Sequence, residues 1–214
     1  MKYLSSFQLK IIAIVTMTID HIGYHLYPET DLYRIIGRIC FPLIAFLLAE
    51  GYKHTSNFGK YLYRLLSFAA VIQVVLYFTG EVYVNIFFTL ACGLILIYGI
   101  EKRQYMIASS VLLIPFLVPL DYGYYGVLMI PLMYFSGKYM VVGFIALNVF
   151  FIEIISQTAF FTYALNDLQY YSILALPLIL VYNGLEGKKM KYFFYFYYPF
   201  HIVVILIIKE LFYV

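Results

Sequence analysis

An Asp-His pair stands inside an apolar stretch near the start of the chain. Residues 17–28 read MTIDHIGYHLYP, and the apolar run that contains Asp20 and His21 begins at Leu9. An imidazole can take up or release a proton near neutral pH, and a neighbouring carboxylate can fix its tautomer. The pair is therefore a candidate for general acid–base chemistry. The alternative is that the two groups simply satisfy each other within a helix bundle.

Helical spacing places further polar side chains around this pair. At 1.5 Å per residue, Asp20 lies ~16 Å along a helix from Leu9, near the middle of a hydrocarbon core roughly 30 Å thick. His21 and His25 are four residues apart on one face, and Tyr24 follows Asp20 by four on the adjacent face. Because ionisable groups at this depth are costly, we treat them as functional candidates.

Two arginines one helical turn apart form a second polar set. Arg34 and Arg38 lie in LYRIIGRICFPLIAFLLAEGYKHT, residues 32–55. Pro42 cannot donate to the carbonyl of Arg38, which leaves that oxygen for a ligand or water. Gly37 permits the close approach of another helix. The guanidinium groups could bind an oxyanion or a phosphate, whereas Arg34 alone could reach the lipid headgroups.

The last apolar run supplies a third set. His201 follows Pro199 by two residues and has Tyr198 nearby in the sequence. The first and last runs are predicted to cross the membrane in the same direction, so His201 lies at a depth similar to that of His21. We expect these side chains to share one site, although a membrane histidine can also be a hydrogen-bonded packing residue.

Three further residues are weaker candidates for substrate binding. Glu50 stands beside Gly51 at the end of the second run, where it could merely face solvent. Asn85 begins the fourth run, and Asp121 lies in the segment PLDYGYYG. Each of the three could equally be a structural hydrogen-bonding group.

Composition identifies the kind of element that must position these residues. The 214-residue chain is 64% hydrophobic and 12% charged, with a mean hydropathy of +0.90. A soluble domain is about half apolar and about a quarter charged, so the sequence predicts an all-α polytopic membrane protein. Cys40 and Cys92 fall within apolar runs and are predicted to be packing residues. No P-loop, GxGxxG, HExxH or GxSxG pattern occurs, and we expect no metal and no nucleic-acid partner.

Nine apolar runs are long enough to be considered as spanning helices. They comprise residues 9–27, 35–52, 61–79, 82–100, 105–120, 122–136, 139–161, 165–183 and 192–212. With nine spans, 11 Lys and Arg residues collect on one side of the membrane and 3 on the other. If the run 122–136 failed to cross, the split would be 8 against 6. Because positive residues favour the cytoplasmic side, we predict nine helices in one bundle, a single domain over residues 1–214, and a cytoplasmic N-terminus.

Several stretches closely resemble the TraX family of integral membrane proteins. They are IDHIGYHLYP (19–28), residues 32–55, KYLYRLL (60–66), NIFFTLACGLILIY (85–98), DYGYYGVLMIPLMY (121–134), LPLILVYNG (176–184) and KYFFYFYYPFHIVVI (191–205). The founding member of that family is implicated in N-terminal acetylation of conjugative pilin. The family is also similar to the broader transmembrane acyltransferases.

The resemblance implies an acetyltransferase in the bacterial cytoplasmic membrane, with acetyl-CoA as the donor. The family's DH pair falls on Asp20 and His21, and its RxxGR motif falls on Arg34 and Arg38. Its AEG motif includes Glu50, and its terminal YPxH falls on residues 198–201. The acceptor could be a peptide N-terminus, a glycan or a lipid.

The resemblance and the polar sets together suggest a mechanism. His21 is predicted to be the general base, Asp20 to orient the site, and His201 to assist or to bond the thioester carbonyl. Arg38 would bind the oxyanion or a donor phosphate. Because neighbours on a helix point about 100° apart, Asp20 could pair with Arg38 or His201 instead of His21.

Two other classes of protein are compatible with the same residues. A proton- or ion-coupled transporter also uses Asp, His and Arg relays, although no inverted repeat is visible in the sequence. A non-catalytic membrane assembly factor could use the aromatic-rich helices as a docking surface.

Overall fold

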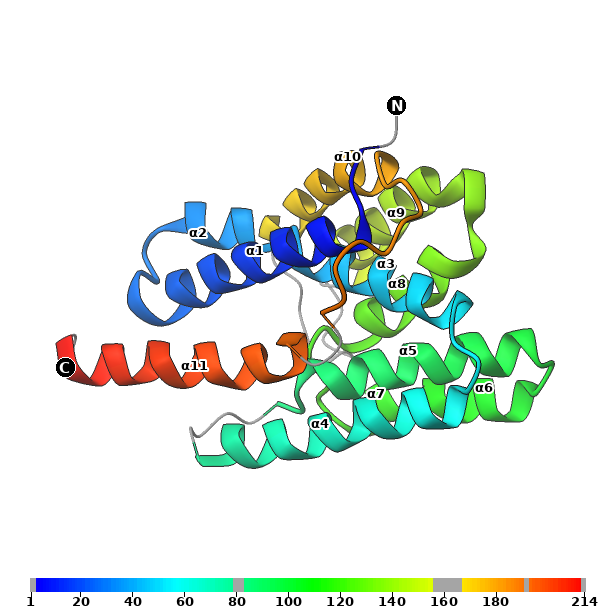
Figure 1. The fold of residues 1–214 in the computed structure, drawn as a ribbon, viewed down its shortest axis with the longest axis horizontal. Coiled ribbons are helices and arrows are strands. Elements are labelled where there is room, and N and C mark those ends of the chain that lie inside the picture. Colours follow the sequence, from blue (N-terminus) through cyan, green and yellow to red (C-terminus); the bar gives the residue numbers. More distant parts are fainter. Residues whose placement is uncertain (1–2, 79–82, 156–166, 191–192, 213–214) are drawn as a thin grey trace. The chain divides into compact units, whose positions relative to one another are not determined.

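The regular structure of this protein is helical throughout the described residues. The computed structural model describes residues 3–78, 83–155, 167–190 and 193–212. The α-helices are α1 (Ser6–Leu26), α2 (Asp31–Gly37), α3 (Cys40–Lys53), α4 (Phe58–Phe78), α5 (Ile86–Glu101), α6 (Tyr105–Leu112), α7 (Ile114–Leu117), α8 (Gly123–Phe135), α9 (Met140–Val149), α10 (Ala175–Leu180) and α11 (Phe193–Phe212). Two 3-10 helices, η1 (Gly137–Tyr139) and η3 (Asp167–Leu174), and a π-helix, η2 (Phe150–Ile155), complete the order (Figure 1).

Each of the nine predicted runs contains helix within its described part. The ends of several runs, at residues 79, 82, 156–161, 165–166 and 192, lie outside the described residues. Among the described residues, three helical stretches are long and apolar enough to cross a membrane: Asp31–Lys53, Phe58–Phe78 and Gly137–Ile155. Shorter apolar helices accompany them at Ile86–Glu101, Tyr105–Leu117, Gly123–Phe135 and Asp167–Leu180. These helices identify the chain as a membrane protein.

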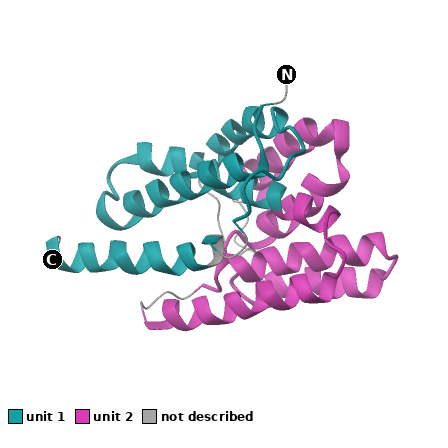
Figure 2. Ribbon diagram, in the orientation of Figure 1, with its two compact units in different colours: residues 1–47, 167–214 teal, residues 48–166 magenta. Residues whose placement is uncertain are grey.

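The described chain separates into two compact units. Unit 1 contains residues 1–47 and 167–214, and unit 2 contains residues 48–166 (Figure 2). Unit 1 therefore consists of an N-terminal and a C-terminal segment of the sequence, whereas unit 2 is one continuous segment. A single domain over the whole chain stays a prediction.

In unit 1, α1 packs against both α2 and α11, and η3 packs against α2 (Figure 1). Ser5 begins α1 with a capping box, because its side chain accepts from the backbone of Gln8 and the Gln8 side chain accepts from the backbone of Ser5. Backbone hydrogen bonds fasten this end to the segment after α10, with Tyr3 N 2.7 Å from Val181 O and Asn183 N 2.8 Å from Leu4 O. These bonds hold the start of α1 in place.

Two glycines allow α1 and α2 to lie unusually close together. A Cβ atom on Gly23 would collide with the side chain of Tyr33, and a Cβ atom on Gly37 would collide with Asp20. The close helix approach predicted for Gly37 is therefore confirmed. The predicted run 35–52 is interrupted after Gly37, and α3 begins at Cys40. Pro42 lies in the first turn of α3, where a missing backbone N–H leaves no helical bond unmade.

In unit 2, α5 lies at the centre and has α4, α6 and α8 packed against it. Its buried side chains face in several directions, including Leu94 and Ile97, which are fully buried. Gly93 allows α8 to approach, because a Cβ atom there would collide with Ile130. The predicted run 105–120 is divided into α6 and α7 at Leu113, just before Pro115.

Candidate functional site

The polar residues of unit 1 gather between α1, α2, α11 and η3. Asp20, from α1, forms an ion pair with Arg34, whose Nη1 lies 2.7 Å from Asp20 Oδ2. Arg38 Nη2 lies 3.8 Å from Asp20 Oδ1. The side chains are largely buried, with 16% of Asp20, 22% of Arg34 and 6% of Arg38 exposed. One of the pairings predicted for Asp20, with Arg38, is thus present in the structure.

The second partner of Arg38 comes from η3. Arg38 Nη1 lies 3.3 Å from Gln169 Oε1, and Gln169 is completely buried. Arg34 and Arg38 bring two guanidinium groups to the carboxylate of Asp20. Positive charge at this position favours an anionic group or a developing oxyanion.

The histidines form a separate arrangement across α1 and α11. His21 Nδ1 lies 2.6 Å from His201 Nε2, and the ring centroids are 4.8 Å apart. His201 Nδ1 lies 2.8 Å from the carbonyl oxygen of Tyr197. His201 is buried, with 4% of its surface exposed, whereas His21 is only half-buried. The common site predicted for His21 and His201 is therefore formed by direct contact.

The partners of these rings fix the positions of their protons. A carbonyl oxygen only accepts, so His201 Nδ1 carries the hydrogen that is donated to Tyr197. In a neutral His201 ring, Nε2 is then an acceptor, and His21 Nδ1 must donate to it. Protonation of His21 would place a further positive charge near the guanidinium groups of Arg34 and Arg38, which favours the neutral ring. His21 Nε2 is consequently the nitrogen with a lone pair available to take a proton.

Tyr197 supports this chain of hydrogen bonds from α11. Its ring stacks on His201 with centroids 5.1 Å apart and an interplanar angle of 9°. Its hydroxyl lies 2.7 Å from Thr18 Oγ1, and Thr18 also donates to the carbonyl of Ile14, at 2.8 Å. These contacts join α1 to α11 one helical turn from the His21–His201 pair.

The other predicted residues of unit 1 lie around the Asp20–arginine contacts and the His21–His201 pair. The Arg34 guanidinium lies 5.1 Å from the centre of the Tyr24 ring, which meets the His25 ring edge-on at 4.8 Å. His25 and His21 have ring centroids 6.4 Å apart. Tyr198 presents its ring edge-on to His21 at 6.1 Å. The structure thus brings all the predicted unit 1 residues into one neighbourhood.

Glu50, Asn85 and Asp121 belong to unit 2 and have partners within it. Glu50 Oε2 lies 3.1 Å from Lys53 Nζ. The backbone oxygen of Asp121 accepts a hydrogen bond from Thr89 Oγ1 at 2.5 Å. Roles for these residues in substrate binding stay predictions.

Asn85 has a clear structural function. Its Oδ1 accepts from Phe87 N at 3.0 Å and caps α5. Its Nδ2 donates to Ala69 O and to Gln73 Oε1, both at 2.8 Å. The residue is fully buried. Asn85 therefore connects the start of α5 to the later part of α4.

Sequence reasoning missed the contributions of Thr18 and Gln169. Gln169 lies in the polar stretch NDLQ that opens the run 165–183, so a signal was present in the sequence. A buried glutamine within an apolar run requires a polar partner. The sequence did not indicate that this partner is Arg38, because the two residues are far apart along the chain.

The arrangement has the elements that acyl transfer requires. A base must accept a proton from the attacking amine or hydroxyl, and His21 Nε2 is suited to that role. Positive charge must stabilise the oxyanion that develops on the acyl carbonyl, and Arg38 is suited to that role.

Comparison with known proteins gives one match over almost the whole chain. The family described as TraX protein matches residues 5–209. A probable fimbrial assembly protein FimC, serogroup H1, of Dichelobacter nodosus is 41% identical over 73 residues, which are 32% of this chain and 30% of that protein. The uncharacterized protein RP591 of Rickettsia prowazekii (strain Madrid E) is 41% identical over 66 residues, or 31% of this chain and 25% of the other. The matched parts therefore cover less than a third of either relative, and no solved structure matches.

Proposed function

This chain belongs to the TraX family, and on that premise we propose that it is a membrane-embedded acetyltransferase. The donor is acetyl-CoA, and the acceptor is an amine or hydroxyl of a peptide, glycan or lipid at or across the membrane. The observation that carries the proposal is the chain of hydrogen bonds from His21 through His201 to the Tyr197 carbonyl. It leaves His21 Nε2 free to accept a proton.

The proposed reaction begins when His21 Nε2 accepts the proton of the attacking N–H or O–H group. The acceptor nitrogen or oxygen forms a bond to the acetyl carbonyl carbon, and the carbonyl oxygen becomes an oxyanion. Arg38 stabilises that oxyanion through its positive charge. The C–S bond of the thioester then breaks, and the leaving sulfur takes the proton from His21. The products are the acetylated acceptor and free CoA.

Asp20 has a different role in this proposal from that of a catalytic triad carboxylate. It binds Arg34 at 2.7 Å and lies near Arg38, so it orients the guanidinium groups. His201 orients His21 instead, and we regard His201 as a positioning residue. Tyr24, His25 and Tyr198 form the remaining wall around His21, where an acceptor would make its contacts.

The proposed location is the bacterial cytoplasmic membrane, with nine spans and a cytoplasmic N-terminus. The distribution of Lys and Arg along the sequence supports this orientation. Acetyl-CoA would then reach the protein from the cytoplasm, where Lys53, Lys60 and Arg64 could attract its phosphates. Lys2 and Lys191 also belong to the 11 Lys and Arg residues assigned to that side of the membrane, but they lie outside the described residues.

The test is acetyl transfer from labelled acetyl-CoA by the purified protein to a panel of peptides, glycans and lipids. His21→Ala should lower the rate by about 10²–10⁴-fold, as expected for loss of a general base. A folded His21→Ala variant that transfers the label as fast as the wild type would refute the assignment of the base.

Two substitutions of His201 separate positioning from packing. The amide of His201→Gln reaches the position of Nε2, so its oxygen can accept from His21 Nδ1. The shorter amide of His201→Asn can donate to the Tyr197 carbonyl but falls short of His21. We therefore expect His201→Gln to retain most of the activity and His201→Asn to lose it, with both variants folded. Equal activity in the two variants would refute the positioning role.

A non-catalytic membrane assembly factor is a second candidate function. The name of the Dichelobacter nodosus relative, a probable fimbrial assembly protein, favours it. The two functions are distinguished by complementation of a strain that lacks the protein. If folded His21→Ala restores surface assembly fully, catalysis is unnecessary. If it fails and the surface proteins also lose an acetyl group in intact-mass profiles, the acetyltransferase is supported.

A further inference from the structure

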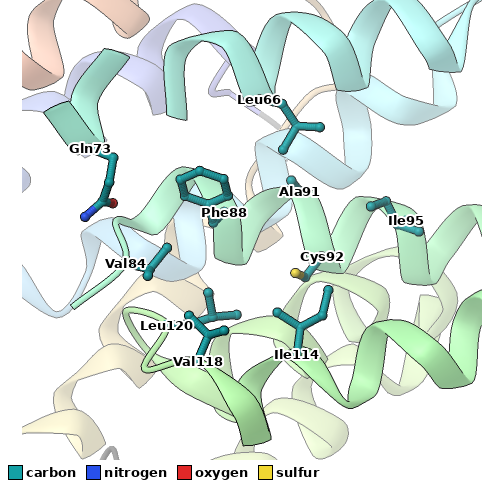
Figure 3. A pocket seen from close by; sticks show the side chains of 10 residues that line it. All are labelled: Leu66, Gln73, Val84, Phe88, Ala91, Cys92, Ile95, Ile114, Val118 and Leu120. Atoms are coloured by element: carbon teal, nitrogen blue, oxygen red, sulfur yellow. The ribbon is translucent and has the colours of Figure 1, made fainter. Parts of the chain in front are cut away.

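Unit 2 contains a groove of about 420 Å³ that the proposed reaction does not use (Figure 3). Leu66 and Gln73 of α4 line one side, and Ile114 of α7 lines the opposite side. Ala91 and Cys92 of α5 are buried between them and form the floor. The volume lies within the range of about 300–1,000 Å³ that is typical of small-ligand pockets. We call this cavity the α4–α7 groove.

The lining of the groove is apolar except at one end. Gln73 is its polar member, and the Gln73 amide is already engaged. Gln73 Oε1 accepts from Asn85 N at 2.9 Å and from Asn85 Nδ2 at 2.8 Å, and Gln73 Nε2 lies 3.3 Å from Tyr83 O. A water molecule needs two to four polar partners to be held in a cavity, and the other lining side chains offer only the weakly polar thiol of Cys92. The lining therefore favours an apolar occupant.

The helices that line the groove also present apolar side chains on their outer surfaces. On α4, Val71 and Val74 are each 59% exposed. Near α7, Leu113 is 59% exposed and Leu117 is 73% exposed. In a soluble protein such side chains would face water at a cost, but in a membrane protein they face hydrocarbon. Ile114, which lines the groove, is half-buried and directly follows the exposed Leu113 in the sequence.

We propose that the α4–α7 groove binds one acyl chain of a membrane phospholipid. Leu66 and Gln73 are seven residues apart on α4, so the groove follows that helix for ~10 Å, about a third of the ~30 Å hydrocarbon core. It therefore receives a segment of a chain and not a headgroup. An empty groove would lose the dispersion contacts of all its walls, and a chain from the surrounding bilayer restores them.

The absence of tryptophan from the sequence makes this proposal directly testable. Phe88→Trp places a single fluorescent reporter on the groove wall, and Val74→Trp places one on the outer face of α4. Each variant is reconstituted in bilayers of phospholipids that carry bromine atoms on their acyl chains, which quench tryptophan on contact. We expect quenching of the Phe88→Trp reporter to be comparable to that of the exposed Val74→Trp reporter.

A second substitution shows whether the quenching comes from within the groove. Ala91→Phe fills the floor, whereas Val71→Phe adds the same side chain to the outer face as a matched control. Ala91→Phe should relieve most of the quenching of Phe88→Trp and leave that of Val74→Trp unchanged. Val71→Phe should affect neither groove occupancy nor the Phe88→Trp signal. Ile95→Trp is an alternative reporter on the same wall if Phe88→Trp does not fold.

Three results would overturn the proposal. Quenching of the groove reporter by a water-soluble quencher, without quenching by brominated chains, would mean that water fills the groove. A lack of quenching by either agent would mean that the groove is closed or filled by the protein itself. Quenching that persists after Ala91→Phe would place the acyl chain on the outer surface. None of these results depends on acetyl transfer, so the proposed enzyme activity is tested separately.

Discussion

Replacement of Gly37 by alanine should separate α1 from α2 at the candidate site. The two helices approach so closely that a methyl group on residue 37 would collide with the Asp20 carboxyl group. Because the methyl group would also collide with the Cβ atom of Asp20, turning the carboxylate is not sufficient and the two helices must move apart. That movement disturbs the 2.7 Å ion pair between Asp20 and Arg34. Gly37→Ala therefore tests the helix packing and the charge arrangement together.

The expected loss of stability follows from two costs. Adding a methyl group to a tightly packed contact costs about 1–3 kcal/mol. Removing one partner of a buried ion pair costs about 3–5 kcal/mol, but here both partners remain and can find new contacts. Since a single collision causes both effects, the costs overlap. We expect Gly37→Ala to lower the free energy of unfolding by roughly 2–4 kcal/mol.

The two buried cysteines provide the assay. Cys40 is 8% exposed and Cys92 is 5% exposed. A charged, water-soluble thiol-reactive dye does not enter the apolar α4–α7 groove, so it labels the two cysteines only when the protein opens. The cysteines of the Gly37→Ala variant should be labelled by the dye at a lower temperature than those of the wild type. Gly59→Ala is the matched control, because a Cβ atom there comes no closer than 3.6 Å to Asn57 Oδ1. That control should be neutral or stabilising by up to about 1 kcal/mol. Equal unfolding of Gly37→Ala and the wild type would refute the close approach of α1 and α2.

Two further substitutions test individual polar groups with the same thiol assay. Asp20→Asn removes the carboxylate that pairs with Arg34 and lies near Arg38, and it should cost about 3–5 kcal/mol. Adding Arg34→Gln should recover part of that loss, and a double variant less stable than Asp20→Asn would contradict the charge argument. Asn85→Ala removes the cap of α5 and its bond to Ala69, and should cost about 2–3 kcal/mol; a change of less than about 0.5 kcal/mol, as at ordinary surface positions, would rule out its structural role.

The positions of the helices could largely be predicted from the sequence. Apolar runs indicate where helices lie because a backbone in hydrocarbon must satisfy its own hydrogen bonds. The internal breaks were harder to predict. The interruption after Gly37 and the division at Leu113 both occur within runs that are predominantly apolar. Pro42 and Pro115 mark these places in the sequence, but a proline in an apolar run can kink a helix as readily as end it.

Most residues of the candidate site could be predicted from the sequence, but their contacts with one another could be predicted only in part. Depth along the helices correctly grouped His21 with His201, because depth follows from residue counting. The nitrogen atoms through which His21 and His201 contact each other depend on the rotation of α1 relative to α11. That rotation is determined by side-chain packing. The alternative partner for Asp20 was foreseen from the angle between neighbouring side chains. The contribution of Gln169 was not foreseen, since η3 is short and lies far along the chain.

The adjacent residues Asp20 and His21 take part in two different sets of contacts, and this follows from helix geometry. Side chains about 100° apart on one helix face different neighbours. Asp20 is directed towards α2, where its Oδ2 binds Arg34 at 2.7 Å and its Oδ1 lies 3.8 Å from Arg38. His21 is directed towards α11, where His201 fixes its tautomer through a backbone carbonyl of that helix. The base and the positive charge are thus held by separate helix pairs, with α1 common to both. Motion of α11 would alter the base without moving the arginines, and motion of α2 would do the reverse.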